Sequence, residues 1–517
     1  MYIATGTYYK IDYSAGVDIS NYRNIPVPTS YMAINSEFNF LGGYENDTKA
    51  GVLHVADHHI SPGKKQWTWG NGDFGKAWDR NLTDEDGPYI ELMAGVYTDN
   101  QPDFSWMQPY EEKTFTQYFL PYRELGVVKN ASADLLMNMD KVGDKAILKI
   151  FATSLQKNAK IVLEGFWEES MDLSPEMVFE REITVGEVLF SDLKLTVFTD
   201  KGLELLSIKS DKQDPKPIPE AAKPASSPED TLTCEQLYLT GLHLEQYRHA
   251  TYNATDYYLE ALKRDPSDVR NNNAMGLWNL RRGKFVLAEK YFHASLETQL
   301  QRNPNPYDGE PRFNLGLALK FQGKNQEAYD AFYKSCWNAA MQDAGYFNCA
   351  QLSCINSNWT NALYEIDKSL IRNWHNHKAR SLKTSILRKQ GKEQEALVLI
   401  EESLEIDLFN FGCLFEKYLL THNKTFLGEM NQLMRAEIHN YEVVALDYIN
   451  AGFYVEAVKI LEEGVKVCST TPMTYYYMGL ALNLAGKEST KVLEKAAAHA
   501  PEYCFPNRLE AILALEC

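Results

Sequence analysis

The residues of this 517-residue chain that are best suited to acid–base chemistry lie between positions 51 and 122. Residues 89–97 read YIELMAGVY, so aliphatic residues alternate with Tyr89, Glu91 and Met93. A β-strand places alternate residues on opposite faces, and we therefore expect Glu91 on an aromatic, amphipathic face. A carboxylate partly removed from water on such a face can act as a general acid or base. The alternative is a solvated glutamate on an edge strand.

An acid–base pair needs a second group, and the adjacent His58 and His59 supply imidazoles within the same stretch. Glu91, His58 and His59 are the predicted catalytic residues, with Glu91 as base and a histidine as acid. The alternative for the two histidines is a loop pair that hydrogen-bonds to backbone. A glycosidase would instead pair Glu91 with a second carboxylate, about 5–10 Å away. Three aspartates are available for this role: Asp57, Asp86 and Asp103.

Flat aromatic side chains accompany these groups, because four of the nine tryptophans fall in this stretch. Indole faces can cover the apolar faces of sugar rings, while amides and carboxylates bind the hydroxyl groups. The predicted substrate-binding residues are Trp67, Trp69, Trp78, Asp86, Tyr89, Gln101, Asp103 and Trp106. Core packing is the commoner fate of tryptophan, so at least two of the four are expected in the core. The predicted ligand is a carbohydrate.

The sequence contains no convincing cofactor or metal motif. The segment SPGKK at 61–65 lacks the first glycine and the Ser/Thr of a phosphate-binding loop. A calcium loop over 82–93 would begin at Leu82 and end at Met93, which excludes an EF-hand. A looser calcium site at Asp84 and Asp86 is the alternative. We predict neither a cofactor nor a metal ion.

The residues that follow Glu91 occur in a distinctive order. Gln101 and a Pro-Asp pair come first, then a Pro-Tyr-Glu turn at 109–111, then an aromatic strand that ends near Phe119. Residues 89–122 thereby resemble the galactose mutarotases, although Tyr110 replaces the glycine of their turn and the gap before Gln101 is longer. That resemblance implies a β-supersandwich with a catalytic glutamate and an opposing histidine. His58 and His59 do not match the positions of the histidines in that family.

The wider region 20–140 more closely resembles an uncharacterised bacterial family. Its members carry a mutarotase-like domain ahead of tetratricopeptide (TPR) repeats. The resemblance carries no settled reaction, so it implies the fold and the domain order alone.

Three kinds of segment must position these residues. Residues 1–130 alternate short apolar runs with turn residues and show almost no helical period, which favours an antiparallel β-sandwich domain. Residues 131–210 read as a second, small β module of immunoglobulin-like size. Residues 211–231 hold five prolines and few apolar residues, so they are predicted to form a linker.

From residue 232 to 517 the apolar period changes from 2 to 3.6 and a repeat appears. Each repeat has a small residue in its first helix, an alanine twelve positions later and a large apolar residue four after that. The sets are Gly276, Ala288 and Phe292; Gly316, Ala328 and Phe332; Ala350, Ala362 and Ile366; Thr384, Ala396 and Ile400; and Ala445, Ala457 and Leu461. The 34-residue spacing resembles the tetratricopeptide repeat over about 232–505, in roughly seven units. We expect a protein or peptide partner on the concave surface.

Composition restricts the class of protein. The formal net charge of −18 argues against nucleic-acid binding, and no apolar run approaches the ~20 residues of a membrane span. All eight cysteines lie at or after Cys234 without a CxxC pair, and the start lacks a signal peptide, so a cytoplasmic setting is predicted. Both ends break off at element-like sequence, which suggests a piece of a longer protein.

Together these features predict a multidomain β + α protein with a mutarotase-like supersandwich, a small sandwich and a TPR solenoid. The predicted function is carbohydrate binding, with or without epimerase-like or glycosidase-like turnover, beside a TPR scaffold for partners. The alternative is a non-catalytic interaction scaffold whose β-sandwich is structural.

Overall fold

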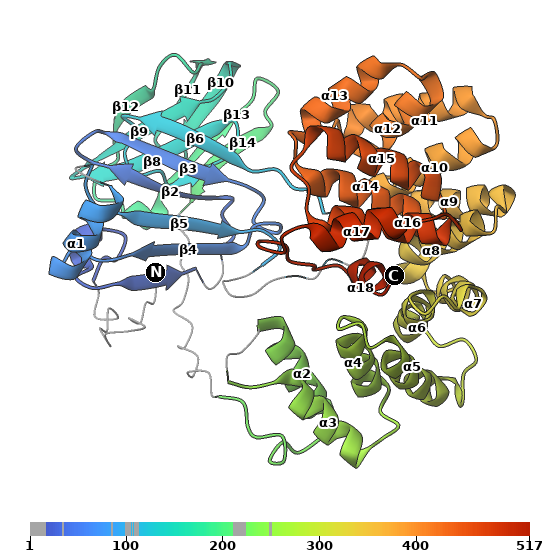
Figure 1. Ribbon diagram of the computed structural model, residues 1–517. Helices are drawn as coiled ribbons and strands as arrows, with labels where there is room; N and C mark the ends of the chain where they lie inside the picture. The colour runs from blue at the N-terminus through green and yellow to red at the C-terminus, as the bar shows by residue number, and fades with distance from the viewer. Residues whose placement is uncertain are drawn as a thin grey trace. The chain divides into compact units, whose positions relative to one another are not determined.

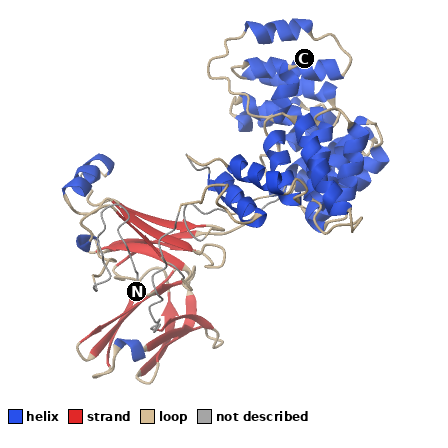
Figure 2. Ribbon diagram, turned by 90° about the horizontal axis from the view of Figure 1, so that it is seen from below, coloured by secondary structure: helices blue, strands red, loops and turns tan. Residues whose placement is uncertain are grey.

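A computed structural model describes residues 17–33, 36–83, 86–98, 105, 107, 113–209, 224–247 and 251–517. The described residues fall into two compact units. The first, here called the β unit, holds every strand together with α1 (Asp73–Leu82). The second, the helical unit, comprises residues 224–517 and is built from helices α2 to α18 (Figure 1). Figure 2 shows the same division of strands and helices by colour.

The N-terminal half of the β unit contains two antiparallel three-stranded sheets (Figure 1). One has the order β1 (Thr29–Met32), β4 (Gly63–Thr68), β5 (Ile90–Gly95), and the other has the order β2 (Phe40–Glu45), β3 (Ala50–Val55), β6 (Tyr118–Arg123). A 3₁₀ turn (η1, Tyr22–Asn24) precedes them. The strand expected from the 89–97 pattern is β5, within one to two residues at each end, whereas the aromatic strand expected to end near Phe119 is β6, which begins at Tyr118 and ends at Arg123.

The second half of the β unit consists of two antiparallel four-stranded sheets. One has the order β12 (Phe179–Thr184), β9 (Lys145–Ala152), β8 (Leu135–Val142), β7 (Asn130–Ala131); the other has the order β11 (Trp167–Leu173), β10 (Gln156–Leu163), β13 (Lys194–Phe198), β14 (Glu204–Lys209). A 3₁₀ turn, η2 (Phe190–Asp192), precedes β13. Alternate residues of β8, β9, β10 and β13 form one buried apolar cluster, so the two sheets enclose a core.

A second apolar cluster crosses the predicted boundary between residues 130 and 131. Leu53 of β3 and Tyr122 of β6 are buried together with Leu136 of β8. The side-chain amide of Asn138 donates to the carbonyl of Leu125 at 3.0 Å. The two β regions therefore share packing and polar contacts.

The helical unit is made of antiparallel helix pairs. The pairs are α2 (Cys234–Tyr247) with α3 (Ala254–Arg264), α4 (Val269–Leu280) with α5 (Phe285–Leu300), α6 (Glu310–Lys320) with α7 (Asn325–Ser335), α8 (Gln342–Ile355) with α9 (Trp359–Arg372), α10 (His377–Lys389) with α11 (Glu393–Ile406), α12 (Phe411–Thr421) with α13 (Lys424–Met434), α14 (Ile438–Asn450) with α15 (Tyr454–Val467), and α16 (Pro472–Leu484) with α17 (Thr490–Ala498). A 3₁₀ turn, η3 (Ala339–Met341), precedes α8, and α18 (Leu509–Leu515) follows α17. The described residues thus form eight pairs, one more than the sequence pattern predicted.

The small residues of the repeat lie where the two helices of a pair approach each other closely. A Cβ atom added at Gly276 of α4 would lie 2.3 Å from the ring of Phe292 in α5, and one at Gly316 would lie 2.7 Å from Phe332. The paired helices approach so closely at these points that only glycine fits without rearrangement. The alanines of the second helices, such as Ala328, are fully buried.

Part of the predicted linker belongs to the helical unit. Residues 210–223 lie outside the described residues, but residues 224–231 pack against the first helix pair. The hydroxyl of Tyr257 donates to the carbonyl of Ser226 at 2.7 Å, and Arg264 donates to the carbonyl of Thr231 at 2.6 Å. The last eight residues of the predicted linker thus pack against the first helix pair.

The array of pairs also folds back on itself. Trp359 at the start of α9 stacks on Phe453 before α15, with ring centroids 5.9 Å apart. A Cβ atom at Gly452 would lie 3.0 Å from the backbone of Ile355 at the end of α8. The fourth and seventh pairs are thereby in contact. Among the described residues, the model contains no helix with both the length and the apolar character needed to cross a bilayer.

Candidate functional site

The pairing of β4 with β5 brings Glu91 opposite Trp67. Directly opposed residues of an antiparallel pair share one face of the sheet, so these two side chains are neighbours. Both are half-buried. Tyr89 lies two residues before Glu91 at the start of β5, where its N–H donates to Asp79 Oδ1 at 3.0 Å and its carbonyl accepts from Thr68 at 3.1 Å. The face predicted from the YIELMAGVY pattern thus carries Glu91 beside an indole.

Four aromatic rings gather next to this face and form what we call the indole cluster: Trp67, Trp69, Phe74 and Trp78. Trp69 stacks on Trp78 with centroids 4.4 Å apart and an interplanar angle of 6°, and it meets Trp67 edge-on at 4.4 Å. Trp78 is 36% exposed and Phe74 is 53% exposed. The cluster therefore presents apolar ring surface to solvent.

Helix α1 supplies Phe74 and Trp78 to this cluster. The expectation of almost no helix in residues 1–130 is wrong here, because residues 73–82 form a 10-residue α-helix. A Cβ atom at Gly75 would lie 1.7 Å from the carbonyl oxygen of Gly70, so only glycine allows the helix to sit this close to β4. Phe74, Ala77 and Trp78 follow an i, i+3, i+4 spacing, which is the sequence signal for this helix.

Asp79 anchors α1 to the surrounding chain. Its Oδ2 accepts from the Tyr22 hydroxyl at 3.1 Å, and the same hydroxyl lies 2.9 Å from the carbonyl of Gly70. Burial and the Asp79 carboxylate both raise the pKa of Tyr22. These contacts fix the position from which Trp78 reaches Trp69.

The expectation that at least two of the four tryptophans are core residues is wrong. Trp67 and Trp69 are only half-buried and Trp78 is exposed. Trp106 lies outside the described residues, as do the predicted binding residues Gln101 and Asp103. The tryptophans stack on one another beside the sheet, because α1 offers a partner surface there.

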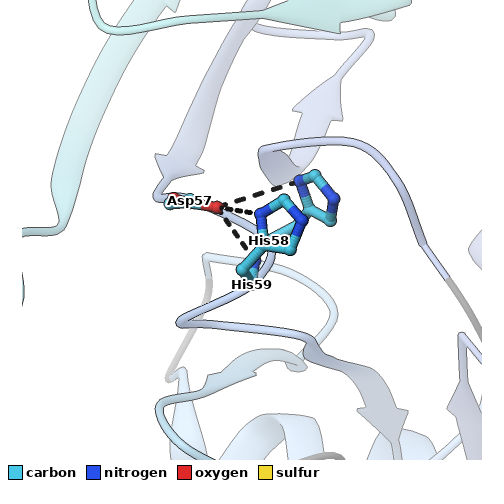
Figure 3. Close-up of side chains that lie close together, drawn as sticks. All are labelled: Asp57, His58 and His59. Carbon is cyan, nitrogen blue, oxygen red and sulfur yellow. Dashed lines mark hydrogen bonds and ion pairs between the residues drawn. The ribbon is translucent and has the colours of Figure 1, made fainter.

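His58 and His59 lie in a turn that follows β3. Because β3 ends at Val55, His54 and His58 do not share a strand face. The N–H and Nδ1 of His58 lie 2.9 and 2.8 Å from Asn39 Oδ1, and the N–H and Nδ1 of His59 both lie 2.9 Å from Asp57 Oδ1. Figure 3 shows the two rings next to each other, both on the same side of the Asp57 carboxylate. The histidines are thus bonded to side-chain oxygens of Asn39 and Asp57.

The histidines and Glu91 belong to different ends of the sheet. Gly63 pairs with Gly95 at one end of the β4–β5 ladder, and Trp67 pairs with Glu91 four residues along it. Four residues of strand span roughly 13 Å. The histidine turn joins the Gly95 end, since Tyr97 N–H donates to the Ile60 carbonyl at 2.8 Å. The structure therefore does not bring His58 or His59 against Glu91.

Asp86 lies in the loop between α1 and β5, where it is exposed. Its N–H donates to the carbonyl of Thr83 at 2.9 Å. The Asp86 side chain is thus solvated in this loop.

Lys64 is a buried amine that the sequence reading missed. It is 6% exposed, and its Nζ donates to Ser36 Oγ at 3.0 Å and to the carbonyl of Phe38. Burial lowers the pKa of Lys64 to about 8. The pKa of His54 is lowered mainly by burial and to a smaller extent by the Lys64 charge. Lys64 lies three residues before Trp67 in β4, so the two side chains point to opposite faces of the sheet. A lysine within a strand normally indicates a solvated face, so no local pattern predicts the burial of Lys64.

The helical unit contains a cavity of about 180 Å³, here called the α8–α14 pocket. Its walls come mainly from the first helices of successive pairs, α8, α10 and α14, and from the segment that leads into α12. Phe347, Leu382, Val444 and Phe453 provide apolar surface, and further lining residues are Gln351, His377, Lys378, Ser381, Ser385, Asp407, Phe409, Asn410, Phe411, Gly412, Asn440, Val443, Asp447 and Tyr448.

The polar groups of this pocket come from two helices and a loop. The Nζ of Lys378 in α10 pairs with Asp447 Oδ1 of α14 at 2.5 Å. Burial raises the pKa of Asp447, and the Lys378 charge opposes that rise. Nε2 of His377 lies 3.7 Å from Asp407 Oδ2, whereas its Nδ1 is buried without a hydrogen-bond partner among the described residues. The pocket therefore combines apolar walls with charged and polar side chains.

Comparison with known families finds matches to two segments of the chain. Residues 7–122 match a family described as Domain of unknown function (DUF5107), and residues 130–208 match one described as YphG-like protein, second domain. The two matches fall on the two halves of the β unit.

Several solved structures are similar to part of the chain. A crystal structure of MamA is 17% identical over 33% of this chain and 91% of its own, with a TM-score of 0.30. YrrB, described as a TPR protein with an unusual peptide-binding site, is 12% identical over 41% and 93%, with a TM-score of 0.29. A tetratricopeptide repeat protein from Parabacteroides merdae is 18% identical over 48% and 98%, with a TM-score of 0.30.

Proposed function

We propose that the helical unit is a protein-interaction scaffold that seats one large apolar side chain of a partner peptide in the α8–α14 pocket. The pocket itself carries this proposal. Its volume of about 180 Å³ compares with the roughly 150 Å³ of an engineered cavity that accepts benzene, so one aromatic or large aliphatic side chain fits. Helix pairs of this kind commonly present such inner surfaces to peptides.

The polar groups of the pocket would fix the orientation of the bound segment. His377 Nδ1 has no partner among the described residues and could bond a peptide N–H or carbonyl, according to its tautomer. Lys378 and Asp447 already neutralise each other, so the pocket offers no net charge at this point. The preferred partner is therefore an apolar anchor flanked by peptide groups.

Filling the pocket should abolish this binding. Val443 lines the pocket and is half-buried, so Val443→Trp places an indole in the space that an anchor residue would take. Peptides from a displayed random library, selected on the full chain, should share a large apolar residue and bind the variant at least tenfold more weakly.

The matched control for this experiment is Val398→Trp. Val398 is 51% exposed on α11, a second helix of its pair, and does not line the pocket. The control should bind the selected peptides as the unmodified chain does. Equal binding by both variants, or peptides without an apolar residue in common, would argue against the pocket as the binding site.

A second candidate function, carbohydrate recognition by the β unit, is favoured by the indole cluster. The stacked Trp69 and Trp78 present exposed ring surface beside Glu91, and sugars bind to such surfaces through their apolar faces. Epimerase-like or glycosidase-like turnover would require Glu91 to act with a group other than His58 and His59.

The cytoplasmic location remains a prediction, and the eight free thiols accord with it.

Substitution of Trp78 tests the carbohydrate proposal. Trp78→Ala removes the most exposed indole of the cluster. A panel of glycans is first screened for one that the unmodified chain binds, and the variant should bind that glycan at least tenfold more weakly in a titration. Trp337→Ala, at a 66% exposed tryptophan of the helical unit, is the control and should bind normally. Reducing ends and anomer ratios, compared with those of Glu91→Gln, report turnover. Binding unchanged by Trp78→Ala contradicts the proposal.

A further inference from the structure

The turn after β3 brings three potential metal ligands together (Figure 3). One ligand atom each from Asp57, His58 and His59 lies within 4.8 Å of the others. Asp57 Oδ1 is 2.9 Å from His59 Nδ1 and 4.0 Å from His58 Nδ1. The two imidazole rings lie side by side, with centroids 4.0 Å apart and an interplanar angle of 36°. One carboxylate oxygen thus lies close to a ring nitrogen of each histidine.

From this geometry we propose that Asp57, His58 and His59 bind a first-row divalent transition ion such as Zn²⁺. Zinc takes nitrogen ligands at about 2.0–2.1 Å and carboxylate oxygens at about 2.0–2.2 Å, so neighbouring ligands of a tetrahedral ion lie about 3.4 Å apart. The two oxygen–nitrogen distances of 2.9 and 4.0 Å lie on either side of that value. Displacements of about half an ångström would bring each pair to the separation in a tetrahedral site.

The identity of the ligands selects the class of ion. Two imidazoles and one carboxylate suit zinc, copper, nickel and iron, whereas calcium and magnesium prefer sites built from oxygen alone. Three protein ligands leave at least one position for water. His59 and Asp57 are exposed, with 77% and 55% of their side chains accessible, so an ion and its water can reach the turn directly.

The backbone of the turn is held in place before any ion binds. Ser61 N–H donates to the Asp57 carbonyl at 2.8 Å, and His59 N–H donates to Asp57 Oδ1 at 2.9 Å. The chain on either side is tied down as well, because Ala56 N–H donates to the Asn39 carbonyl and Tyr97 N–H to the Ile60 carbonyl. Binding would therefore cost little backbone ordering. An ion must displace two hydrogen bonds, the one between Asn39 and His58 Nδ1 and the one between Asp57 Oδ1 and His59 Nδ1.

Calorimetric titration of ZnCl₂ into the full-length chain tests the proposal. The unmodified protein should bind one equivalent through this turn. His58→Ala and His59→Ala should each raise the Kd of that equivalent at least tenfold, because each removes a ligand. His293→Ala is the matched control, since His293 lies 3.7 Å from the Glu289 carboxylate and belongs to no such ligand cluster among the described residues. It should bind zinc as the unmodified chain does.

Asp57→Asn separates metal binding from the stability of the turn. Its amide oxygen can still accept from the His59 N–H, so circular dichroism should be unchanged, while loss of the charge should weaken zinc binding at least tenfold. A direct readout on the unmodified chain is the NMR of the histidine rings, where zinc should shift or broaden the His58 and His59 signals. Unchanged His58 and His59 signals, or variants that bind zinc as the control does, would overturn the proposal.

Discussion

Replacing Arg388 by methionine is expected to destabilise the helical unit by about 3–5 kcal/mol, the range measured when one partner of a buried ion pair is removed. The guanidinium binds the Glu416 carboxylate through both oxygens, with Nε at 2.6 Å from Oε2 and Nη2 at 3.0 Å from Oε1. Glu416 is fully buried. Without Arg388 its charge would remain in the interior with hydroxyl donors alone.

The contacts around Glu416 explain why the effect should be large. Ser385 and Tyr448 donate hydroxyls to Glu416 Oε1 at 2.8 and 2.7 Å, and Arg388 reaches Glu456 at 3.0 Å. The network thereby joins α10, α12, α14 and α15. Burial, and then the Glu416 charge, raise the pKa of Tyr448. Burial lowers the pKa of Arg388, but pairing with Glu416 outweighs it and the net pKa is raised.

Chemical denaturation followed by circular dichroism measures this effect. Lys392→Met is the control, because Lys392 and its partner Glu395 are 42% and 64% exposed and their pair at 3.9 Å should contribute little. Adding Glu416→Gln to Arg388→Met should restore part of the stability, since no uncompensated charge is then buried. A loss for Arg388→Met within about 1 kcal/mol of that for Lys392→Met would show that the network is not stabilising.

Gly276→Ala is expected to destabilise the helical unit by about 1–2 kcal/mol, although alanine is the better helix former. The new Cβ atom would lie 2.3 Å from Cε1 of Phe292, a ring that is fully buried between α4 and α5. Neither helix can move without disturbing its other neighbours. Overpacking should therefore exceed the gain of about 1 kcal/mol in helix propensity.

Gly428→Ala is expected to have the opposite effect on the stability of the helical unit. Gly428 lies inside α13, and a Cβ atom there would meet nothing within 4 Å. This substitution should stabilise the unit by about 0.5–1 kcal/mol through helix propensity alone. Phe292→Leu introduced into Gly276→Ala should recover part of the loss by relieving the contact. If both glycine variants stabilise the protein, close packing of α4 on α5 is not what requires glycine at position 276.

The helical array was predictable because its contacts repeat along the chain. A small residue in one helix meets a large residue sixteen positions later, as Gly316 meets Phe332, so the pattern that forms each contact is visible in the sequence itself. Strand alternation likewise placed Glu91 on the face that Trp67 shares, because two-residue periodicity follows from backbone geometry. The α12–α13 pair was harder to place, since its sequence departs from the small–alanine–large spacing.

The candidate sites depended on contacts that no local pattern encodes. Alternation gave the face of Glu91, but only the fold of α1 over β4 brought Trp78 onto Trp69. Proximity in sequence suggested that His58 could serve Glu91, whereas strand pairing placed them at opposite ends of one ladder. The α8–α14 pocket combines residues from Phe347 to Phe453.

By itself, then, the sequence determined the periodic elements: the strands, the helix pairs and the close contacts within each pair. Tertiary structure alone decided which side chains from distant segments meet, how far Lys64 is removed from water and where a cavity remains. The physical reason is that periodicity fixes only the direction in which a side chain points. What it meets there depends on long-range packing, in which many elements compete for the same apolar surface.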